Sequence, residues 1–322
     1  MSIPAGYHRL WSHRTYQAHW SIRLIFALGG AFALQNSILH WSSDHRIHHK
    51  HVDNNDKDPY SAKMGFWYSH IGWMCREYQG DRYDDYRNTR DLQKDGIVMW
   101  QHKHYLLLML LMNIGIPIAF GLWHGDLINS LLLVGFFRLV MSHHTTFFIN
   151  SLAHVWGKQT YTDDNTARDN GFLAFLTFGE GYHNYHHIFE NDYRNGIRWW
   201  QFDPTKWLIK TCHWLGLADK LRTTPEDKIE KARIAMMLKQ VKAKLVSHPN
   251  TDHILINLQQ EYELLIDKIN AYYQIKKKLL HSKHERLLAD VDGSELVAQY
   301  LELKETLVKQ RRSWMLFTEK LG

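Results

Sequence analysis

The sequence predicts an all-α protein with helices that cross a membrane, and three features of the chain support this class. An uncharged apolar stretch runs from Tyr105 to Trp123, and a second follows the Gly125-Asp126 break. At about 1.5 Å of rise per residue, the first stretch just crosses a hydrocarbon core of roughly 30 Å. Beyond Pro225 the composition shifts to Lys, Glu, Leu and Gln, with apolar residues at helical spacing.

The two apolar stretches predict an antiparallel pair of membrane spans near residues 105–123 and 127–149, with a buried structural helix as the alternative for each. The connection between them contains no Lys or Arg, whereas the segment before the first span carries Arg76, Arg82, Arg87, Arg90, Lys94 and Lys103. Because basic residues concentrate in cytoplasmic segments, both outer ends of this hairpin are predicted to face the cytoplasm. Residues 20–41 are also mostly apolar, but polar side chains interrupt them, so we expect a helix that lies in the membrane interface.

The C-terminal region, residues 225–322, is predicted to be a helical, coiled-coil-like cytosolic tail that follows a catalytic domain of residues 1–224. Its apolar seam residues alternate spacings of four and three, as in a coiled coil, with Lys276 at the one seam position that is not apolar. They are Leu258, Tyr262, Leu265, Ile269, Tyr272 and Leu279. Breaks at residues 248–250 and 292–294 divide the tail into three helices, which form either a hairpin or an oligomerising coil.

The composition excludes several classes of protein. The net charge is +6, but no clustered basic stripe favours nucleic acid as a partner. Cys75 and Cys212 are too few and too far apart for a disulfide framework or a zinc knuckle, which fits a reducing, cytoplasm-facing chain. The 13 Trp suit a membrane interface, whereas the 23 His exceed what an ordinary domain needs and require a separate explanation.

The histidines gather in clusters with the spacing of metal ligands. In DHRIHH and GYHNYHH they fall at positions i, i+3 and i+4, so on a helix the rings share one face and can converge on one or two ions. The two rings of HRLWSH lie about 140° apart on an ideal α-helix and converge only near a helix end or with help from neighbours. With NSLAH, these clusters supply more imidazoles than a tetrahedral zinc site uses, which predicts two metal ions. The histidines concerned are His8, His13, His45, His48, His49, His154, His183, His186 and His187.

The order of the clusters along the chain agrees with the predicted hairpin. The first two clusters precede the spans and the last follows them, and two crossings return the chain to its starting side. All the clusters can therefore meet at one cytoplasmic surface, with His154 just past the second span.

The clusters, in this order and spacing, resemble those of the integral-membrane acyl desaturases of the stearoyl-CoA desaturase type. The likeness runs through GYHRLWSHRTY, ALQN, WSSDHRIHHKHVDNNDKDPYS, GFWYSHIGW, NSLAHVWG and GEGYHNYHH to about Leu217, and NGIRWWQFDPTKWLI is similar to the bacterial branch. The resemblance implies integral membrane helices under a cytosolic helical cap that holds a di-iron site.

The resemblance also implies roles for particular residues. It makes the nine clustered histidines the ligands of two iron ions, with Asn150 positioning a metal-bound water. Gln35, Trp41, Thr146 and Phe147 match positions that line the acyl tunnel, and Arg46 and Arg76 match positions near the headgroup of the acyl carrier. Phe147 stands where animal relatives have Trp, and Glu77 stands where they have a basic residue.

The activity that the resemblance implies is O2-dependent insertion of a cis double bond into a saturated acyl chain. Δ9 is the family's usual position and acyl-CoA its usual substrate. Two external electrons come from a separate protein, such as ferredoxin or cytochrome b5 with its reductase, because the chain has no HPGG segment of a fused cytochrome b5. Asp44, Glu180 and Asn150 are candidates to orient the ligand rings. The expected location is a membrane with the active site in the cytoplasm, the bacterial inner membrane rather than the endoplasmic reticulum.

Three alternatives compete with this interpretation. A related di-iron lipid or alkyl hydroxylase would use the same histidine motifs. A His-rich metal-binding membrane protein without catalysis would place its ligands within the bilayer, whereas these clusters lie outside the spans. The third alternative is an inactive, truncated chain. Family members carry a hydrophobic hairpin before the first cluster, where this chain has seven residues, so we expect a chain truncated at its N-terminus.

Overall fold

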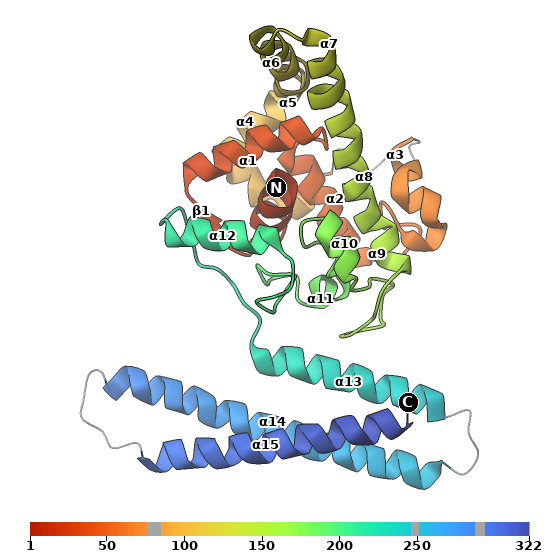
Figure 1. Ribbon diagram of the computed structural model, residues 1–322, viewed down its shortest axis with the longest axis vertical. Helices are drawn as coiled ribbons and strands as arrows, with labels where there is room; N and C mark the ends of the chain where they lie inside the picture. The colour runs from red at the N-terminus through yellow and green to blue at the C-terminus, as the bar shows by residue number, and fades with distance from the viewer. Residues whose placement is uncertain (76–84, 246–250, 287–293, 322) are drawn as a thin grey trace. The chain divides into compact units, whose positions relative to one another are not determined.

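The computed structural model describes residues 1–75, 85–245, 251–286 and 294–321, which form helices, connecting loops and one two-stranded sheet (Figure 1). The predicted all-α class is confirmed. The chain divides into two compact units. Unit 1 comprises Met1–Gln159 and Asp163–Thr224, and unit 2 comprises Thr160–Thr162 and Pro225–Gly322.

Unit 1 consists of a helical body and a long apolar hairpin. The elements before the hairpin are η1 (Ser2–Ser12), β1 (Gln17–Ala18), α1 (Trp20–Ala33), α2 (Ile38–His51), η2 (Ala62–Met64), η3 (Tyr68–Gly72), α3 (Trp73–Cys75), η5 (Arg87–Thr89), η6 (Leu92–Lys94) and α4 (Gly96–Lys103). The hairpin is built from α5 (Tyr105–Leu110), η7 (Leu111–Gly115), α6 (Ile116–His124), α7 (Leu127–Ser130), η8 (Leu131–Phe137) and α8 (Arg138–Asn150). After it come α9 (Leu152–Val155), α10 (Gly171–Leu176), α11 (His183–Ile188), α12 (Pro204–Trp214) and β2 (Ala218–Asp219).

The first element, η1, is wound as a π-helix, in which a backbone amide bonds the carbonyl five residues back. The amide of His13 donates to the carbonyl of His8 at 3.1 Å, and the two ring centroids lie 4.9 Å apart. The π-helical winding therefore brings together two rings that an α-helix would direct about 140° apart. The core of unit 1 holds η1 in place, since Tyr7 and Trp11 pack with Phe26 of α1 and Ile38 of α2.

The apolar segment of residues 20–41 forms two helices, so the prediction of one helix along it is wrong. Leu34 and Asn36 adopt left-handed backbone conformations, with φ of +54° and +71°, which end α1. The Ser37 hydroxyl then accepts from the amide of His40 at 3.3 Å and caps α2. The helices α1 and α2 meet at 80° and are together apolar enough for one broken span, so the expected interfacial position stays a prediction.

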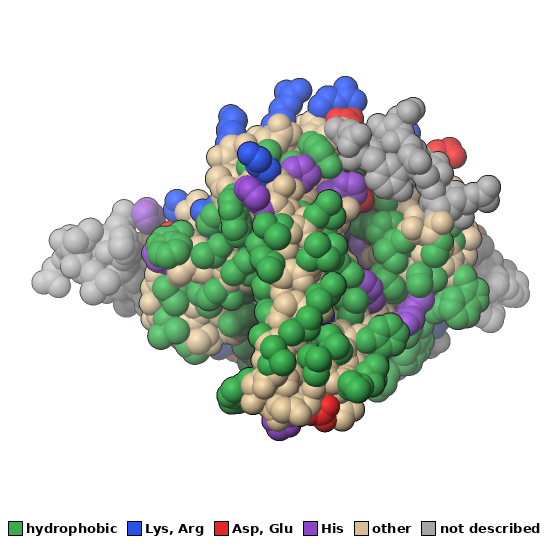
Figure 2. All heavy atoms as spheres, turned by 90° about the horizontal axis from the view of Figure 1, so that it is seen from above, with side chains coloured by type: hydrophobic (Ala, Val, Ile, Leu, Met, Phe, Trp, Pro, Cys, Tyr) green, Lys and Arg blue, Asp and Glu red, His purple; other side chains and the backbone are tan. Residues whose placement is uncertain are grey.

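The two predicted spans are confirmed as helices that are long and apolar enough to cross a membrane, Tyr105–His124 and Leu127–Val155. Between them, Gly125 takes a φ of +79° and the carboxylate of Asp126 caps the next helix by accepting from the amide of Asn129 at 3.1 Å. Large apolar side chains cover the hairpin, as a lipid-facing surface requires, and Figure 2 shows them spread over this face with Lys and Arg at its edge. In Figure 1 the α6–α7 turn lies at one end of unit 1 and α11 at the other.

Arg138 lies within the second span and has partners for its charge. Its guanidinium donates to the carbonyl of Phe32 at 2.6 Å and to the side chain of Asn113 at 2.7 Å, and it stacks on the Phe32 ring. An ionised side chain at membrane depth needs such partners. Arg138 thus joins α8 to α1 and to η7.

Unit 2 contains three helices, α13 (Glu226–Leu245), α14 (Asp252–Arg286) and α15 (Ser294–Leu321). Of the predicted α14 seam, Leu258, Leu265 and Ile269 are fully buried, and they form a core with Leu307 and Trp314 of α15. The predicted break at residues 248–250 and most of the one at 292–294 lie outside the described residues. The cytosolic or oligomerising role of this region stays a prediction.

The close packing of η1 on α1 predicts a cost for any side chain at Gly30. A Cβ there would lie 2.1 Å from the Tyr7 ring, which is fully buried. We expect Gly30→Ala to lower the free energy of unfolding by about 1–3 kcal/mol through overpacking. Thermal unfolding of the detergent-solubilised chain measures the change. Gly115→Ala is the matched control, because nothing lies within 4 Å of its Cβ position. A Gly30→Ala protein as stable as this control would contradict the packing.

Candidate metal centre

The structure brings the nine predicted histidines together in two adjacent groups, each with its ligand nitrogens within 4.8 Å of one another. Members of one sequence cluster are divided between the groups, and rings from different groups stack, since the centroids of His49 and His187 lie 4.3 Å apart. The first histidine group is His8, His13, His45, His49 and His186. The second histidine group is His48, His154, His183 and His187.

Four helical elements of unit 1 supply these rings. The helices η1 and α2 carry the two N-terminal clusters, α9 carries His154, and α11 carries the C-terminal cluster. The helix α11 has only one to two turns and is held from outside, because the carboxylate of Asp169 accepts from the amide of Tyr185 at 3.0 Å. Asp169 also bridges Lys158 and Tyr182 through its backbone, which fixes the loop between α9 and α11. Residues far apart in sequence therefore meet on fixed supports.

Four of the clustered rings are held in the protonation state that binds metal. Burial, with the neighbouring rings, holds the pKa of His13, His183, His186 and His187 well below the ordinary value. These side chains are neutral at physiological pH, and the neutral imidazole is the form that donates a lone pair to a metal ion.

In the first histidine group, two carboxylates determine how the rings present their Nε2 atoms to one another. His8 Nδ1 lies 2.8 Å from Glu180 and His49 Nδ1 lies 3.2 Å from Glu190, so in each ring the carboxylate fixes the proton on Nδ1. The Nε2 atoms of both rings face His186 Nε2, at 2.9 and 3.0 Å. His186 has at most one proton there. A cation between the rings would satisfy all of them.

The second histidine group has the same arrangement. His48 Nδ1 lies 2.8 Å from Asp58, and His154 Nδ1 lies 2.8 Å from the Thr166 hydroxyl. That hydroxyl donates to a carboxylate and so accepts from His154. The Nε2 atoms of both rings point into the group. There, the Nε2 atoms of His154 and His183 lie 3.1 Å apart. A second cation fits here for the same reason.

The donor set is suited to two transition-metal ions. Imidazole nitrogens bind iron, copper, nickel and zinc, and the ring count exceeds the four ligands of one tetrahedral site. The convergence of ring nitrogens and the neutral state of four of the rings both fit bound cations. The arrangement can therefore hold a two-metal centre in a buried site at the end of unit 1 opposite the α6–α7 turn (Figure 1).

The acids around the rings were only partly foreseen. Glu180 orients His8, as expected, and burial would raise the pKa of Glu180, yet His8 and Arg9 lower it to about 2. Asp44 lies 3.5 Å from His40, which belongs to neither group. Sequence analysis missed Asp58, Glu190 and Thr166. The signal available for the first two was their position shortly after a histidine cluster.

Arg9 links this outer layer to the fold. It is 1% exposed, and its guanidinium donates to Glu180 at 2.8 Å and to Asp203 at 3.1 Å. Asp203 in turn accepts from two backbone amides before α12. The ring of His8 is thus fixed through a buried network of charges, which loses stability sharply when one partner is removed.

The other predicted site residues occupy the surroundings of the two groups. The Gln35 amide donates to the Thr146 hydroxyl at 2.8 Å, joining the end of α1 to α8. Trp41 stacks on His45 with centroids 4.8 Å apart, and Phe147 is buried. Arg46 donates to Asp91 and to backbone carbonyls of η1. Asn150 ends α8, and Arg76 and Glu77 lie outside the described residues.

Comparison with known proteins finds relatives that match most of the chain. The family model described as fatty acid desaturase matches residues 1–218. Acyl-CoA desaturase 1 of Saccharomyces cerevisiae is 44% identical over 76% of this chain and 48% of its own length. Stearoyl-CoA desaturase 5 of Homo sapiens is 38% identical over 72% of each chain, and the sn-2 palmitoyl-lipid 9-desaturase of Nostoc is 37% identical over 70% of this chain and 78% of its own.

The chain spans about half the length of the yeast relative that it matches. The relatives include yeast, human and cyanobacterial proteins, so they do not support the predicted placement in a bacterial branch or a preference for the bacterial inner membrane. The predicted roles of the individual residues stay predictions.

Asp58 provides a test of the outer layer of acids. It is fully buried, and His48 and two backbone amides lower its pKa against the effect of burial. We expect Asp58→Asn to weaken binding of the metal in the second histidine group by about 10–100-fold, because an orienting partner of a ligand ring is lost. Competition with a chelator, followed by metal analysis, measures this. Asp56→Asn, an exposed change in the same loop, should have no effect, and equal affinities for the two variants would refute the role of Asp58.

Proposed function

The chain belongs to the fatty acid desaturase family, and from this premise we propose that it catalyses O2-dependent insertion of a cis double bond into a saturated fatty acyl chain. The observation that carries the proposal is the pair of histidine groups. No side-chain base can remove hydrogen from an unactivated methylene, so the reaction needs a metal that activates oxygen. We assign two iron ions to the groups, and when bound they would supply that oxidising chemistry.

The reaction balances with two electrons from outside. Adjacent methylenes of the acyl chain lose two hydrogens, and together with O2, two electrons and two protons they yield the alkene and two molecules of water. The chain itself supplies position. Its rings would hold the metals, and the acids beside Nδ1 of His8, His48 and His49 favour the tautomer that presents Nε2 to the centre.

The acyl chain is proposed to pass beside Gln35, Trp41, Thr146 and Phe147. Trp41 contacts a ring of the first histidine group, so this path leads to the metals. The bond between Gln35 and Thr146 holds α1 against α8 and would fix the shape of the path. Shape would select which carbon–hydrogen bond reaches the oxidant, which is catalysis by orientation.

The names of the relatives support a proposal for the acyl carrier and for the position of the double bond. The yeast and human relatives are named for acyl-CoA and stearoyl-CoA, which favours a coenzyme A ester, whereas the cyanobacterial one is named for a lipid-bound chain and for position 9. We propose acyl-CoA as the substrate and Δ9 as the position. Arg46 and Arg76 are proposed near the carrier headgroup, and Asn150 on a metal-bound water. A separate donor such as ferredoxin or cytochrome b5 supplies the electrons on the cytoplasmic side.

Expression in a desaturase-deficient host tests the activity. We expect a new cis-monounsaturated fatty acid, absent from a His48→Ala variant that has lost a metal ligand. His51→Ala is the matched control, since His51 ends the same helix but belongs to neither group. Gas chromatography with mass spectrometry identifies the product. A hydroxylated acid in place of the alkene would favour the hydroxylase alternative and contradict desaturation.

The shape of the acyl path gives a second prediction. Thr146→Val keeps the volume but removes the hydroxyl that accepts from Gln35. Loss of a hydrogen bond of about 0.5–1.5 kcal/mol predicts a roughly 2–10-fold lower yield of unsaturated acid, with products mixed in double-bond position. Thr145→Val removes only a hydroxyl bonded to the backbone of its own helix and serves as control. Identical product profiles for the two variants would show that Thr146 does not shape the path.

A further inference from the structure

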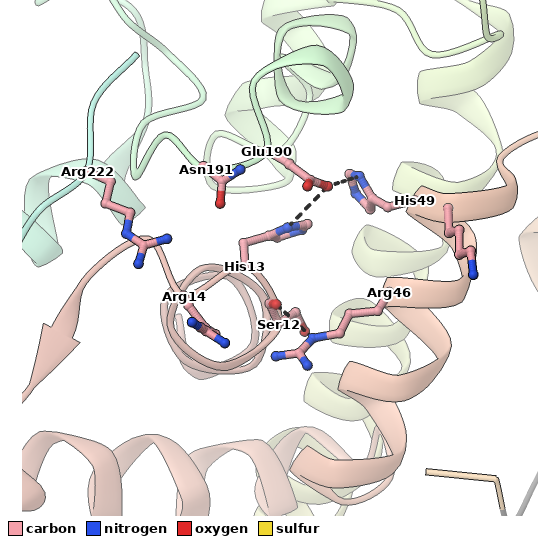
Figure 3. A pocket seen from close by; sticks show the side chains of 9 residues that line it. Ser12, His13, Arg14, Arg46, His49, Glu190, Asn191 and Arg222 are labelled. Carbon is pink, nitrogen blue, oxygen red and sulfur yellow. Dashed lines mark hydrogen bonds and ion pairs between the residues drawn. The ribbon is translucent and has the colours of Figure 1, made fainter. Parts of the chain in front are cut away.

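A pocket of about 510 Å³ lies beside the first histidine group, at the junction of η1, α2 and the loop that follows α11. Figure 3 shows Glu190 facing His13 and His49, with Arg14, Arg46 and Arg222 around the same space. The residues that line it are Ser12, His13, Arg14, Arg46, His49, Lys50, Glu190, Asn191 and Arg222.

The rim of this pocket carries an excess of positive charge. Arg14, Lys50 and Arg222 are exposed, and they come from three different segments of unit 1. Among the described residues, no acidic side chain lies within ion-pair distance of Lys50 or Arg222. Asp91 pairs closely with Arg46 and lies 3.4 Å from Arg14. The only acid in the lining is Glu190, which the rings below it already engage.

The wall of the pocket belongs to the metal centre. His13 and His49 are both members of the first histidine group, and no member of the second group lines the pocket. Glu190 lies between these two rings, since its carboxylate is 3.2 Å from His49 Nδ1 and 3.8 Å from His13 Nδ1. Here two histidines of the first group form part of the pocket wall.

We propose that this basic pocket is the docking site of an acidic electron-donor protein, and that electrons enter the centre through the first histidine group. The proposal rests on the proposed function, which requires two external electrons. In each docking event the donor is oxidised by one electron and the metal centre is reduced by one, so two events serve one turnover. A donor seated here would be close to the centre, and electron transfer weakens steeply with distance.

The charge pattern favours a protein over a small anion. Three cations on separate segments form a broad positive rim, which attracts an acidic surface from a distance and raises the rate of association. A small anion would gain nothing from the metal-centre histidines in the wall. An acidic redox protein gains both the electrostatic attraction and the short path.

The test is the binding of two acidic probes, a soluble cytochrome b5 and a ferredoxin, to the metal-free full chain in nanodiscs. We expect one probe to bind at low salt and its affinity to fall as salt rises. Lys50→Glu with Arg222→Glu should weaken that binding by at least about tenfold and flatten the salt dependence. Lys63→Glu, an exposed change outside the pocket, is the control. Circular dichroism, and the metal content after loading with iron, show whether the double variant folds.

Rapid mixing of the reduced probe with the iron-loaded chain gives the second measurement. The rate of probe oxidation should fall by a similar factor in the double variant and stay unchanged in the control. Equal binding and oxidation rates for the two variants would overturn the proposal, as would binding that salt does not affect. So would a raised KM for stearoyl-CoA with unchanged probe binding, since the pocket would then serve the acyl carrier. Failure of the dithionite-reduced wild type to form any alkene would instead refute the proposed function.

Discussion

The structure of unit 1 depends on one constraint, the convergence of ring nitrogens whose lone pairs face one another. Acids and hydroxyls outside the groups hold protons on Nδ1 and so leave Nε2 with no proton to share. Buried rings whose Nε2 atoms face one another in this way are well placed around cations, which would relieve the repulsion of their lone pairs. The short helices that carry these rings are arranged to produce this convergence, including the π-helix η1.

The hairpin and the outer network serve the same centre from opposite sides. The hairpin returns the chain at His154 to the histidines of η1 and α2, and Arg138 fixes the hairpin to the body through the backbone of α1. On the other side, Arg9 and Glu180 connect His8 to α12. The candidate metal site is therefore preorganised by rigid elements, as the proposed oxidation of an unreactive carbon–hydrogen bond would require.

Sequence analysis predicted the all-α class, the two spans, the seam of α14 and the nine converging histidines, because each depends on local periodicity or on a short motif. It did not predict the division of a cluster such as DHRIHH between two groups, since that follows from where α11 lies opposite α2. The break after Leu34 and the π-helical winding of η1 also escaped it, because backbone strain and close packing determine them. Acids such as Glu190 belong to no recognisable motif, so the sequence did not identify them as partners of the ligand rings.

Iron K-edge X-ray absorption on the full chain, loaded anaerobically with Fe²⁺ and quantified, tests the central claim most directly. The account predicts two iron ions per chain, each surrounded mainly by imidazole nitrogens, one ion for each histidine group. A single iron ion per chain, or a first shell dominated by oxygen or sulfur, would contradict it.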